Sequence, residues 1–543
     1  MLGPPKLRSL DRPVAVSLEA LVPPDNFYRD LDAKLDLGFV RELVRDRYAE
    51  VGRPSIDPVV FFKLQLVMFF EGIRSERQLI EIASLHLAHR WYLGYHLDEP
   101  LPDHSSLTRI RDRYGLGVFR RFFERVVDLC QEAGLVWGKE LFFDATKVRA
   151  DAAVDSLRPR LHEVAREHVE ELFAPGAAPP ESGAPLAAAS GAQSTQGAEQ
   201  PAAGTVGESA RWELLERCRL DPDRPAVNGY RRTTDFCAST TDPDAAPMSS
   251  GGKMALGYHD HYVVDGGRNR IILCALVTPA DVMENQPMLD LLRRVRFRWR
   301  LRPRRAVGDT TYGTAENIRA LEEAGIRAYM PLPAFDQRTP YYGASRFTYI
   351  PERDEYRCPQ GQTLRRDRAK YTEQVVVYRA EAAACNGCPV KSACTASADG
   401  RQVRRSFHAE YLERVRAYHA TPAYEKAMRK RKVWVEPLFA EAKQWHGLRR
   451  CRLRGLPKVN SDALVIAAGQ NLKRWLAATG WGRRHGPCGR LALRAPRPQH
   501  SGHRVPVCAG AQFVGRQGIF QRAQVFPDIE GVGTRRGRQT AAG

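Results

Sequence analysis

The sequence lacks any apolar run long enough to cross a membrane. The best candidate, residues 61–70, is too short and contains Lys63. The first residues also lack the apolar stretch of a secretory signal, so we expect a protein of the reducing cytoplasm. A nucleotide-binding loop is missing too, because Pro247 replaces its first glycine and Met254 replaces the Ser or Thr that should follow Lys253. These absences argue against a membrane protein and against a nucleotide cofactor.

Acidic residues are too few to balance the basic ones. The 543 residues include 83 Lys and Arg against 63 Asp and Glu, a formal net charge of +20. An excess of this size indicates a polyanionic partner. Charge alone does not distinguish nucleic acid from an anionic membrane surface. Hydrophobic residues make up 43% of the chain, enough for a folded core, which argues against a wholly disordered protein.

Hydrophobic periodicity divides the chain into three parts. Residues 1–137 are predicted to form an all-α domain, and residues 138–478 a mixed α/β sheet flanked by helices. Residues 479–543 contain almost only arginine among their charged residues, with frequent Gly, Pro and Gln. We interpret this segment as a disordered basic tail, or alternatively as GC-rich DNA translated in a shifted frame.

Two insertions interrupt the α/β part. Residues 174–210 are dominated by Ala, Gly and Pro and predict a flexible, disordered linker. Residues 342–400 carry four cysteines with the spacing C-x26-C-x2-C-x5-C, namely Cys358, Cys385, Cys388 and Cys394. One C-x2-C pair with two further thiols could close a tetrahedral structural Zn²⁺ site; the alternative is four reduced thiols without a ligand.

Three acids stand out by position. Asp144 and Asp309 each end a predicted strand, and Glu436 lies on a predicted helix. Such carboxylates can converge on two Mg²⁺ or Mn²⁺ ions, which support in-line attack on a phosphodiester. For any one acid the simpler interpretation is a turn or capping carboxylate. Rivals in the same region are Asp242, Asp244, Asp260, Asp265 and Asp281.

Helix geometry indicates which neighbouring side chains can share a site with Glu436. Pro437 fits best in a first helical turn, so the helix is expected to begin near Glu436. Lys443 follows seven residues later and shares the face of Glu436. Glu441 follows five residues later and lies about 140° around the helix, so it cannot easily join the same site.

Clusters of arginine predict contacts with DNA phosphates. Residues 293–305 hold eight arginines, and four more follow the third acid. Such groups bind by charge and position DNA without reading its sequence. A predicted helix near residue 109 carries three others, which fit either a DNA-entering helix or a solvated basic face. The DNA-binding candidates are Lys443, Arg449, Arg450, Arg452, Arg454, Arg109, Arg111 and Arg113.

The motifs around these acids resemble a known family. FFDATK at 142–147, VGDTTYG at 307–313, and VEPLF with the K-x3-GL-x3-RxRG pattern at 435–455 resemble the three acidic blocks of bacterial insertion-sequence DDE transposases. Upstream, RPSIDP at 53–58 and PDHSSLTR at 102–109 resemble the helical N-terminal domain of that family. The resemblance covers about residues 15–478.

The resemblance implies an RNase H-like catalytic domain that uses two Mg²⁺ ions to cleave and transfer DNA strands. Asp144, Asp309 and Glu436 would be the metal ligands, and Lys443 would contact a phosphate near the cut. The implied partners are double-stranded terminal inverted repeats and target DNA, with a homodimer joining two ends at the bacterial nucleoid. Two rival functions are a metal-dependent nuclease without strand transfer and an inactive DNA-binding copy.

Overall fold

The structure is a computed structural model that describes residues 15–49, 55–159, 230, 237–333, 336 and 339–480. These residues fall within one compact unit that ends at Arg483. The predicted linker at 174–210 and all but two residues of the predicted tail lie outside the described residues. The domain limits expected from the sequence therefore stay predictions.

The N-terminal part is helical, as the sequence predicts. Residues 58–70 form one helix, with Pro58 in its first turn and the Asp57 side chain accepting a hydrogen bond from the Val59 N–H. Residues 76–93 form two helices, because His86 ends one and caps the next. The helices are α1 (Leu18–Leu21), α2 (Phe27–Lys34), α3 (Phe39–Val44), α4 (Pro58–Phe70), α5 (Glu76–Leu85), α6 (Leu87–Leu93) and α7 (His104–Glu132), with a 3₁₀ turn η1 (Arg45–Arg47) after α3.

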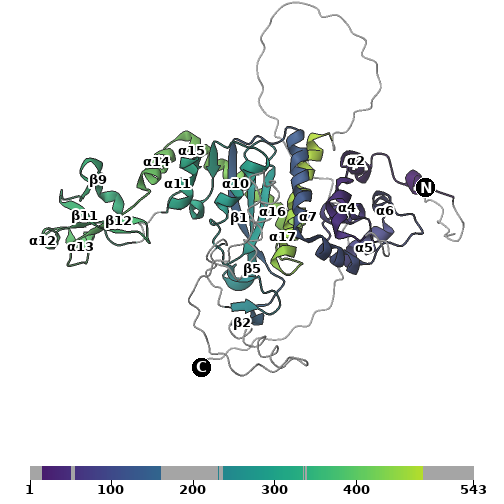
Figure 1. Cartoon of the computed structure of the whole chain (residues 1–543), viewed down its shortest axis with the longest axis horizontal. Helices are drawn as coiled ribbons and strands as arrows, with labels where there is room; N and C mark the ends of the chain where they lie inside the picture. Colours follow the sequence, from purple (N-terminus) through teal and green to yellow (C-terminus); the bar gives the residue numbers. More distant parts are fainter. Residues whose placement is uncertain are drawn as a thin grey trace, which may run out of the picture. The chain divides into compact units, whose positions relative to one another are not determined.

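Helix α7 connects the N-terminal helices to the rest of the fold. It is capped by Asp103 and kinks at Gly115, whose φ of 65° is a conformation that favours glycine. It packs along α17 (Leu456–Ala478), as Figure 1 shows. One buried core runs from Phe122 of α7 to Val263 of the sheet and Leu472 of α17. The helical part and the sheet therefore fold around a shared core.

A mixed six-stranded sheet forms the centre of the α/β part. Strand β1 pairs antiparallel with β5 and parallel with β7, and β5 also pairs with β4 and β6. Helices flank this sheet, which is consistent with an RNase H-like fold (Figure 1). Its strands are β1 (Glu140–Arg149), β4 (Ala246–Ser250), β5 (Lys253–Asp265), β6 (Ile272–Pro279), β7 (Arg305–Val307) and β8 (Arg327–Tyr329).

The prediction that Asp144 ends its strand is wrong. Strand β1 continues to Arg149, because the β-branched residues Thr146 and Val148 pair with Asp260 and Tyr258 of β5. Asp309 does follow its strand, two residues after β7 ends. Asp144 therefore lies within a strand, whereas Asp309 lies in the turn after one.

Helix α17 protects the outer edge of the sheet. The Asn471 side chain both accepts from the Ile272 N–H and donates to the Ile272 carbonyl of β6. Asn460 makes the same pair of bonds with Val277. These amides replace a neighbouring strand, which satisfies edge groups that would otherwise be open to pairing.

The predicted cysteine-bearing insertion forms its own antiparallel sheet. Its strand order is β13-β12-β11-β10-β9. A small cluster of buried side chains, including Tyr356, Leu364 and Tyr378, packs this sheet. The elements, in chain order, are the 3₁₀ turn η5 (Ala344–Arg346), β9 (Thr348–Ile350), the 3₁₀ turn η6 (Pro351–Arg353), β10 (Glu355–Arg357), β11 (Thr363–Lys370), β12 (Val375–Ala380), α12 (Ala382–Asn386), α13 (Lys391–Cys394) and β13 (Gln402–Ser406).

The remaining elements complete the α/β part. In the portion of the chain that is described, none of the helices combines the length and the apolar character needed to span a membrane. A short two-stranded ribbon joins β2 to β3. The elements are η2 (Val154–Ser156), β2 (Leu157–Pro159), β3 (Cys237–Ser239), α10 (Met288–Arg298), η3 (Thr310–Tyr312), α11 (Ala315–Glu323), α14 (Ala409–His419), α15 (Pro422–Trp434) and α16 (Glu436–Trp445).

Candidate active site

Strand β1 presents Asp144 on the sheet face that α16 covers. Asp144 is paired with Tyr262 of β5, and directly opposed residues in an antiparallel pair share a face. The Tyr262 ring stacks on Phe439 of α16, with ring centroids 4.4 Å apart. Helix α16, which carries Glu436 and Lys443, therefore lies over the same face as Asp144.

A tight turn presents Asp309. Its Oδ1 accepts a hydrogen bond from the Thr311 N–H at 2.8 Å and so caps η3. A Cβ on Gly313 would lie 2.5 Å from the Pro331 carbonyl oxygen, and one on Gly308 would meet the Tyr312 side chain at 2.9 Å. The VGDTTYG motif thus needs both glycines to bring the chain close enough to seat Tyr312 in the core beneath Asp309.

One guanidinium joins the two aspartates. Arg431 Nη2, from the last turn of α15, lies 3.0 Å from Asp144 Oδ1 and 3.6 Å from Asp309 Oδ2. The side chains of Arg431 and Asp144 are 13% and 9% exposed, so the contact is shielded from water. The fold therefore brings two of the three predicted acids together around a single positive charge.

Burial and mutual repulsion act on the acids of this site. Burial raises the pKa of Asp144, and the Asp309 charge raises it further, while Arg431 opposes the rise. A further carboxylate, Glu284, follows β6; burial and the negative charges of Asp309 and Asp144 raise its pKa. Glu284 Oε1 also lies 3.7 Å from His259 Nε2. The site thus contains one more carboxylate, that of Glu284, than the sequence predicts.

Glu436 begins α16, as predicted, but is not in contact with the aspartates. Its side chain is exposed, and among the described residues its carboxylate has no hydrogen bond or ion pair. Within the same part of the chain, no three His, Cys, Asp or Glu side chains are gathered closely enough to hold a metal ion. The structure therefore joins Asp144 to Asp309 and leaves Glu436 apart from them.

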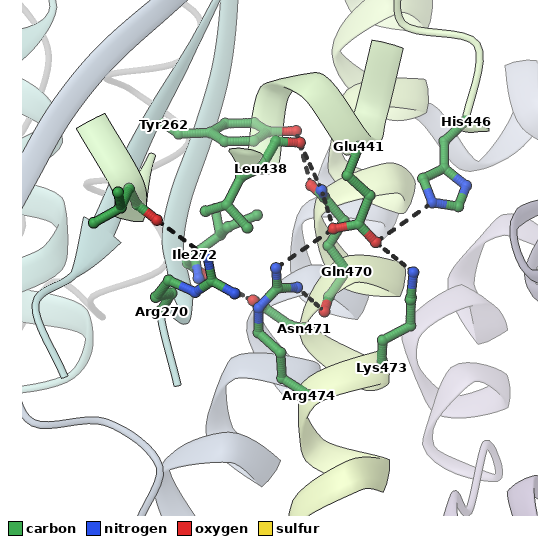
Figure 2. Close-up of polar contacts among 11 residues, drawn as sticks. Tyr262, Arg270, Ile272, Leu438, Glu441, His446, Gln470, Asn471, Lys473 and Arg474 are labelled. Atoms are coloured by element: carbon green, nitrogen blue, oxygen red, sulfur yellow. Dashed lines mark hydrogen bonds and ion pairs between the residues drawn. The ribbon is translucent and has the colours of Figure 1, made fainter. Parts of the chain in front are cut away.

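Glu441 has a different role, as its position around the helix predicts. Figure 2 shows its carboxylate facing α17, where Gln470 donates a hydrogen bond of 3.1 Å and Lys473 and Arg474 form ion pairs. Burial alone would raise its pKa, but His446, at 3.8 Å, and the charges of Arg474 and Lys473 bring the pKa well below the usual value. Glu441 therefore fastens α16 to α17.

Lys443 lies beside a buried acid of the sheet. Asp260 is paired with Thr146, two residues from Asp144 and on the same face. Its carboxylate is fully buried and has no hydrogen-bond partner among the described residues; burial raises its pKa well above the usual value, although Lys443 opposes the rise. Burial in turn lowers the pKa of Lys443, which Asp260 counteracts. The ammonium group is therefore placed near Asp260, on the sheet face that Asp144 shares.

The other rival acids bind the protein backbone. Asp265 accepts hydrogen bonds from the N–H groups of Trp137, Gly138 and Gly267. Asp242 accepts hydrogen bonds from the Tyr258 hydroxyl and from the Gly455 N–H, just before α17. Asp244 accepts one from the N–H of the first residue of α17. These partners explain the three acids structurally.

Some predicted DNA-binding residues are at the surface. Arg109 and Arg113 are exposed on α7 with a spacing of one turn, and Arg113 lies over the Tyr48 ring. Arg449 is exposed. Arg450 and Arg454 are also largely exposed, and both pair with Asp151. These five groups can reach a phosphate.

Arg111 and Arg452 are inside the protein. Arg111 pairs with Glu76 of α5, and Arg452 Nη1 lies 2.9 Å from the same carboxylate. The Nε and Nη2 of Arg452 donate to Asp462 of α17 at 3.1 and 2.7 Å. In this conformation neither guanidinium can bind a phosphate, so DNA contact by these two stays a prediction that requires the cluster to open.

The arginine-rich segment around α10 has two faces. Arg294 and Arg298 pair with Glu124 of α7 at 3.2 and 3.1 Å. On the other face, arginines surround Phe297, which is 60% exposed. An open groove on this face is lined by Arg293, Arg296, Arg300 and Arg302 together with Phe297 and Leu301.

The four predicted zinc ligands line one small apolar pocket. Cys358 lies between β10 and β11, and the others lie in and around α12 and α13. The Gln362 N–H donates to Cys358 Sγ at 3.3 Å, and the Arg401 N–H donates to Cys385 Sγ at 3.4 Å. Burial raises the pKa of Cys394, and the other three thiols contribute to the rise. The four thiols thus line one pocket, although the sulfurs are not close enough as they stand to ligate one ion, so the zinc site stays a prediction.

Sequence reasoning missed Arg431 and Glu284. Arg431 is one of four consecutive basic residues, at 429–432, and nothing in their order distinguishes it from the other three. Glu284 lies in a loop whose return to the sheet the sequence does not reveal. In both cases only the tertiary fold identifies the residue.

Comparison with protein families identifies two transposase regions. A transposase domain (DUF772) matches residues 16–113, and a transposase DDE domain matches residues 357–476. Neither curated proteins nor solved structures gave a match. The first region covers the N-terminal helices, and the second covers Glu436 and Lys443 but neither aspartate.

Both matches are to domains of transposases. Together with the mixed sheet, the two matches support, more particularly, an insertion-sequence DDE transposase. Transposases bind DNA, and DDE transposases generally use divalent metals. The match to the DDE domain is therefore the one that points to a DNA-cleaving enzyme.

Proposed function

We propose that this protein cleaves the ends of an insertion sequence and joins the released 3′-OH to target DNA. The observation that carries the proposal is the convergence of Asp144 and Asp309 on one guanidinium cation. Two carboxylates that are distant in sequence and share one positive charge form a site that favours cations. Hydrolysis at the element end would come first, and attack of the 3′-OH on target DNA second.

Asp144 and Asp309 would hold the divalent cations that the family implies. Carboxylate oxygens suit Mg²⁺ or Mn²⁺, and the pair is half-shielded from water. When bound, two such ions would polarise the scissile phosphate and stabilise charge on the leaving oxygen. The third carboxylate would be Glu436, which requires α16 to move nearer, and Glu284 is a rival for this place because it already lies near both aspartates.

Basic side chains would hold the DNA against this site. Lys443 would contact a phosphate near the cut, because it lies over the Asp144 face. Arg449, Arg450 and Arg454 follow on the same chain segment, and Arg109 and Arg113 of α7 would bind the terminal inverted repeats. The arginine-lined groove of α10 fits a further stretch of backbone.

Two further properties follow from this reaction. Joining a pair of element ends requires them to be held together, so we expect a homodimer on two inverted repeats. A protein with chromosomal DNA as substrate would work at the nucleoid. Light scattering of the protein with one and with two end duplexes would test the dimer, and a 1:1 complex at both ratios would contradict it.

A joining assay with pre-cleaved element ends tests the function. Wild type with Mg²⁺ should transfer the 3′-OH into a target plasmid, whereas Asp309→Asn should neither cleave nor join. Cleavage without joining would favour the plain nuclease, and binding without either reaction would favour the inactive copy.

We also propose that the cysteine cluster binds structural zinc. The two N–H···S hydrogen bonds stabilise thiolates, and four thiolate ligands would leave no open position for catalysis. Metal analysis of purified protein should find one zinc per chain, and Cys388→Ser should lose it. Cys451→Ser, which alters a buried thiol elsewhere, should retain the metal. Equal zinc in both variants, or none in wild type, would contradict the site.

A further inference from the structure

Arg431 makes fewer contacts with its two acids than Arg452 makes with Glu76 and Asp462. Only its Nη2 reaches the two aspartates, and its Nε is buried without a hydrogen-bond partner among the described residues. Arg452, by contrast, uses Nε, Nη1 and Nη2 on two carboxylates. Buried donors are normally satisfied, so Arg431 is held less completely than Arg452 is.

The position of Arg431 is the one that a cation bound by both aspartates must take. Its Nη2 is within 4 Å of an oxygen of each side chain. Without a positive charge there, the two carboxylates would repel each other. A guanidinium between them offsets this repulsion and holds them close together.

We propose that Arg431 is a built-in substitute cation, which holds the Asp144–Asp309 pair together until a divalent ion displaces it. This inference rests on the proposed metal-binding role of that pair. The guanidinium and the ion carry like charge and compete for the same oxygens, so the protein must release Arg431 to load the site. Once released, Arg431 becomes free to bind a phosphate of the incoming DNA.

The displacement also involves the third acid. Arg431 lies in the last turn of α15, and Val435 alone separates that helix from α16, which begins at Glu436. A shift of this turn would therefore be transmitted directly to Glu436, whose carboxylate is exposed and without a partner among the described residues. Binding of the ion would thus remove Arg431 from the two aspartates and allow Glu436 to approach them.

Metal titration of the full-length protein tests the inference without DNA or turnover. Mn²⁺ is the probe, with free Mn²⁺ measured by electron paramagnetic resonance. Arg431→Gln should bind Mn²⁺ at least about tenfold more tightly than wild type, because the competing charge is gone. The matched control is Arg429→Gln, an exposed arginine of the same helix, which should leave the affinity unchanged.

A stability measurement guards against a misfolded variant. Without metal, Arg431→Gln should melt below wild type, and Mn²⁺ should raise its melting temperature by more than it raises that of wild type. Arg431→Lys keeps a positive charge on a shorter reach and should bind Mn²⁺ with intermediate affinity. If Arg431→Gln binds no more tightly than wild type, Arg431 does not compete and the inference is overturned.

Removing the aspartates separates this inference from the proposed function. Asp144→Asn and Asp309→Asn should each abolish the Mn²⁺ binding of wild type. If they leave it intact, the metal site itself is misplaced and both proposals fail. If they abolish it but Arg431→Gln gains nothing, only the role of Arg431 fails.

Discussion

Two groups of acidic side chains form ion pairs with the C-terminal helices, and their surroundings differ. Glu441 is surrounded by Gln470, Lys473 and Arg474, so its charge is fully compensated by α17. Asp144 and Asp309 share a single nitrogen of Arg431. The first arrangement is complete within the protein, whereas the second is short of positive charge.

The difference separates a structural acid from a functional one. A fully compensated carboxylate stabilises the fold, because removing it leaves buried cations without a partner. A pair of carboxylates that shares one cation can bind a further cation, and it contributes little to the stability of the fold. Substitutions of the two groups should therefore have opposite effects on activity and on stability.

The largest effect is expected at Asp144. Asp144→Asn keeps the size of the side chain but removes the charge that would bind a cation. Mg²⁺-dependent cleavage of element ends should fall by at least about a thousandfold, or about 4 kcal/mol in the barrier, while the variant stays folded. Cleavage within tenfold of wild type would remove Asp144 from the active site.

Two glutamates of α16 offer the sharpest contrast. Glu441→Gln should lower the free energy of unfolding by about 2–4 kcal/mol, because Lys473 and Arg474 lose their counter-ion. Glu436→Gln, at an exposed position, should change it by no more than about 0.5 kcal/mol and yet abolish cleavage. Urea unfolding and a cleavage assay on both variants check this. Reversed results would mean that the two roles have been exchanged.

Acid should weaken the Glu441 contact specifically. Because the folded pKa of Glu441 lies below its usual value of 4.5, its contribution is complete above pH 4.5 and is lost as pH falls through the folded pKa. The free energy of unfolding of wild type should therefore decrease more steeply below pH 4.5 than that of Glu441→Gln. Parallel curves in urea titrations at several pH values would contradict the depressed pKa.

The smallest effect concerns salt. Lys443→Ala should reduce the slope of log affinity for DNA against log salt by about one, since one phosphate contact is lost. Arg452→Met should leave the slope unchanged but destabilise the fold, because that guanidinium is occupied by Glu76 and Asp462. A reduced slope for Arg452→Met would show that the buried cluster opens on DNA.

The sequence predicts the fold class and several elements well. Helix periodicity and Pro58 locate α4, and the start of α16 at Glu436 follows from Pro437. The wrong end for β1 has a local cause. Asp144 interrupts an apolar run, and only the pairing of Thr146 and Val148 with β5 shows that the strand continues.

The charged parts of the site are harder to predict. Arg452 and Arg449 look alike in sequence, but the first is enclosed by two acids and the second is exposed. Arg431 and its neighbours differ only in where the turn of α15 points them. Long-range ion pairs depend on how distant segments pack, and one sequence contains no direct signal of that packing.

The most direct test of the metal site is cleavage of the protein backbone by bound iron. Fe²⁺ is added in place of Mg²⁺ with ascorbate, and the radicals formed at the site cut the nearest peptide bonds. Cuts should occur in β1 near Asp144 and beside η3 near Asp309, with a further cut at the start of α16 near Glu436, and Asp309→Asn should lose all of them. Cuts confined to other segments, or unchanged cuts in Asp309→Asn, would contradict a metal site at these acids.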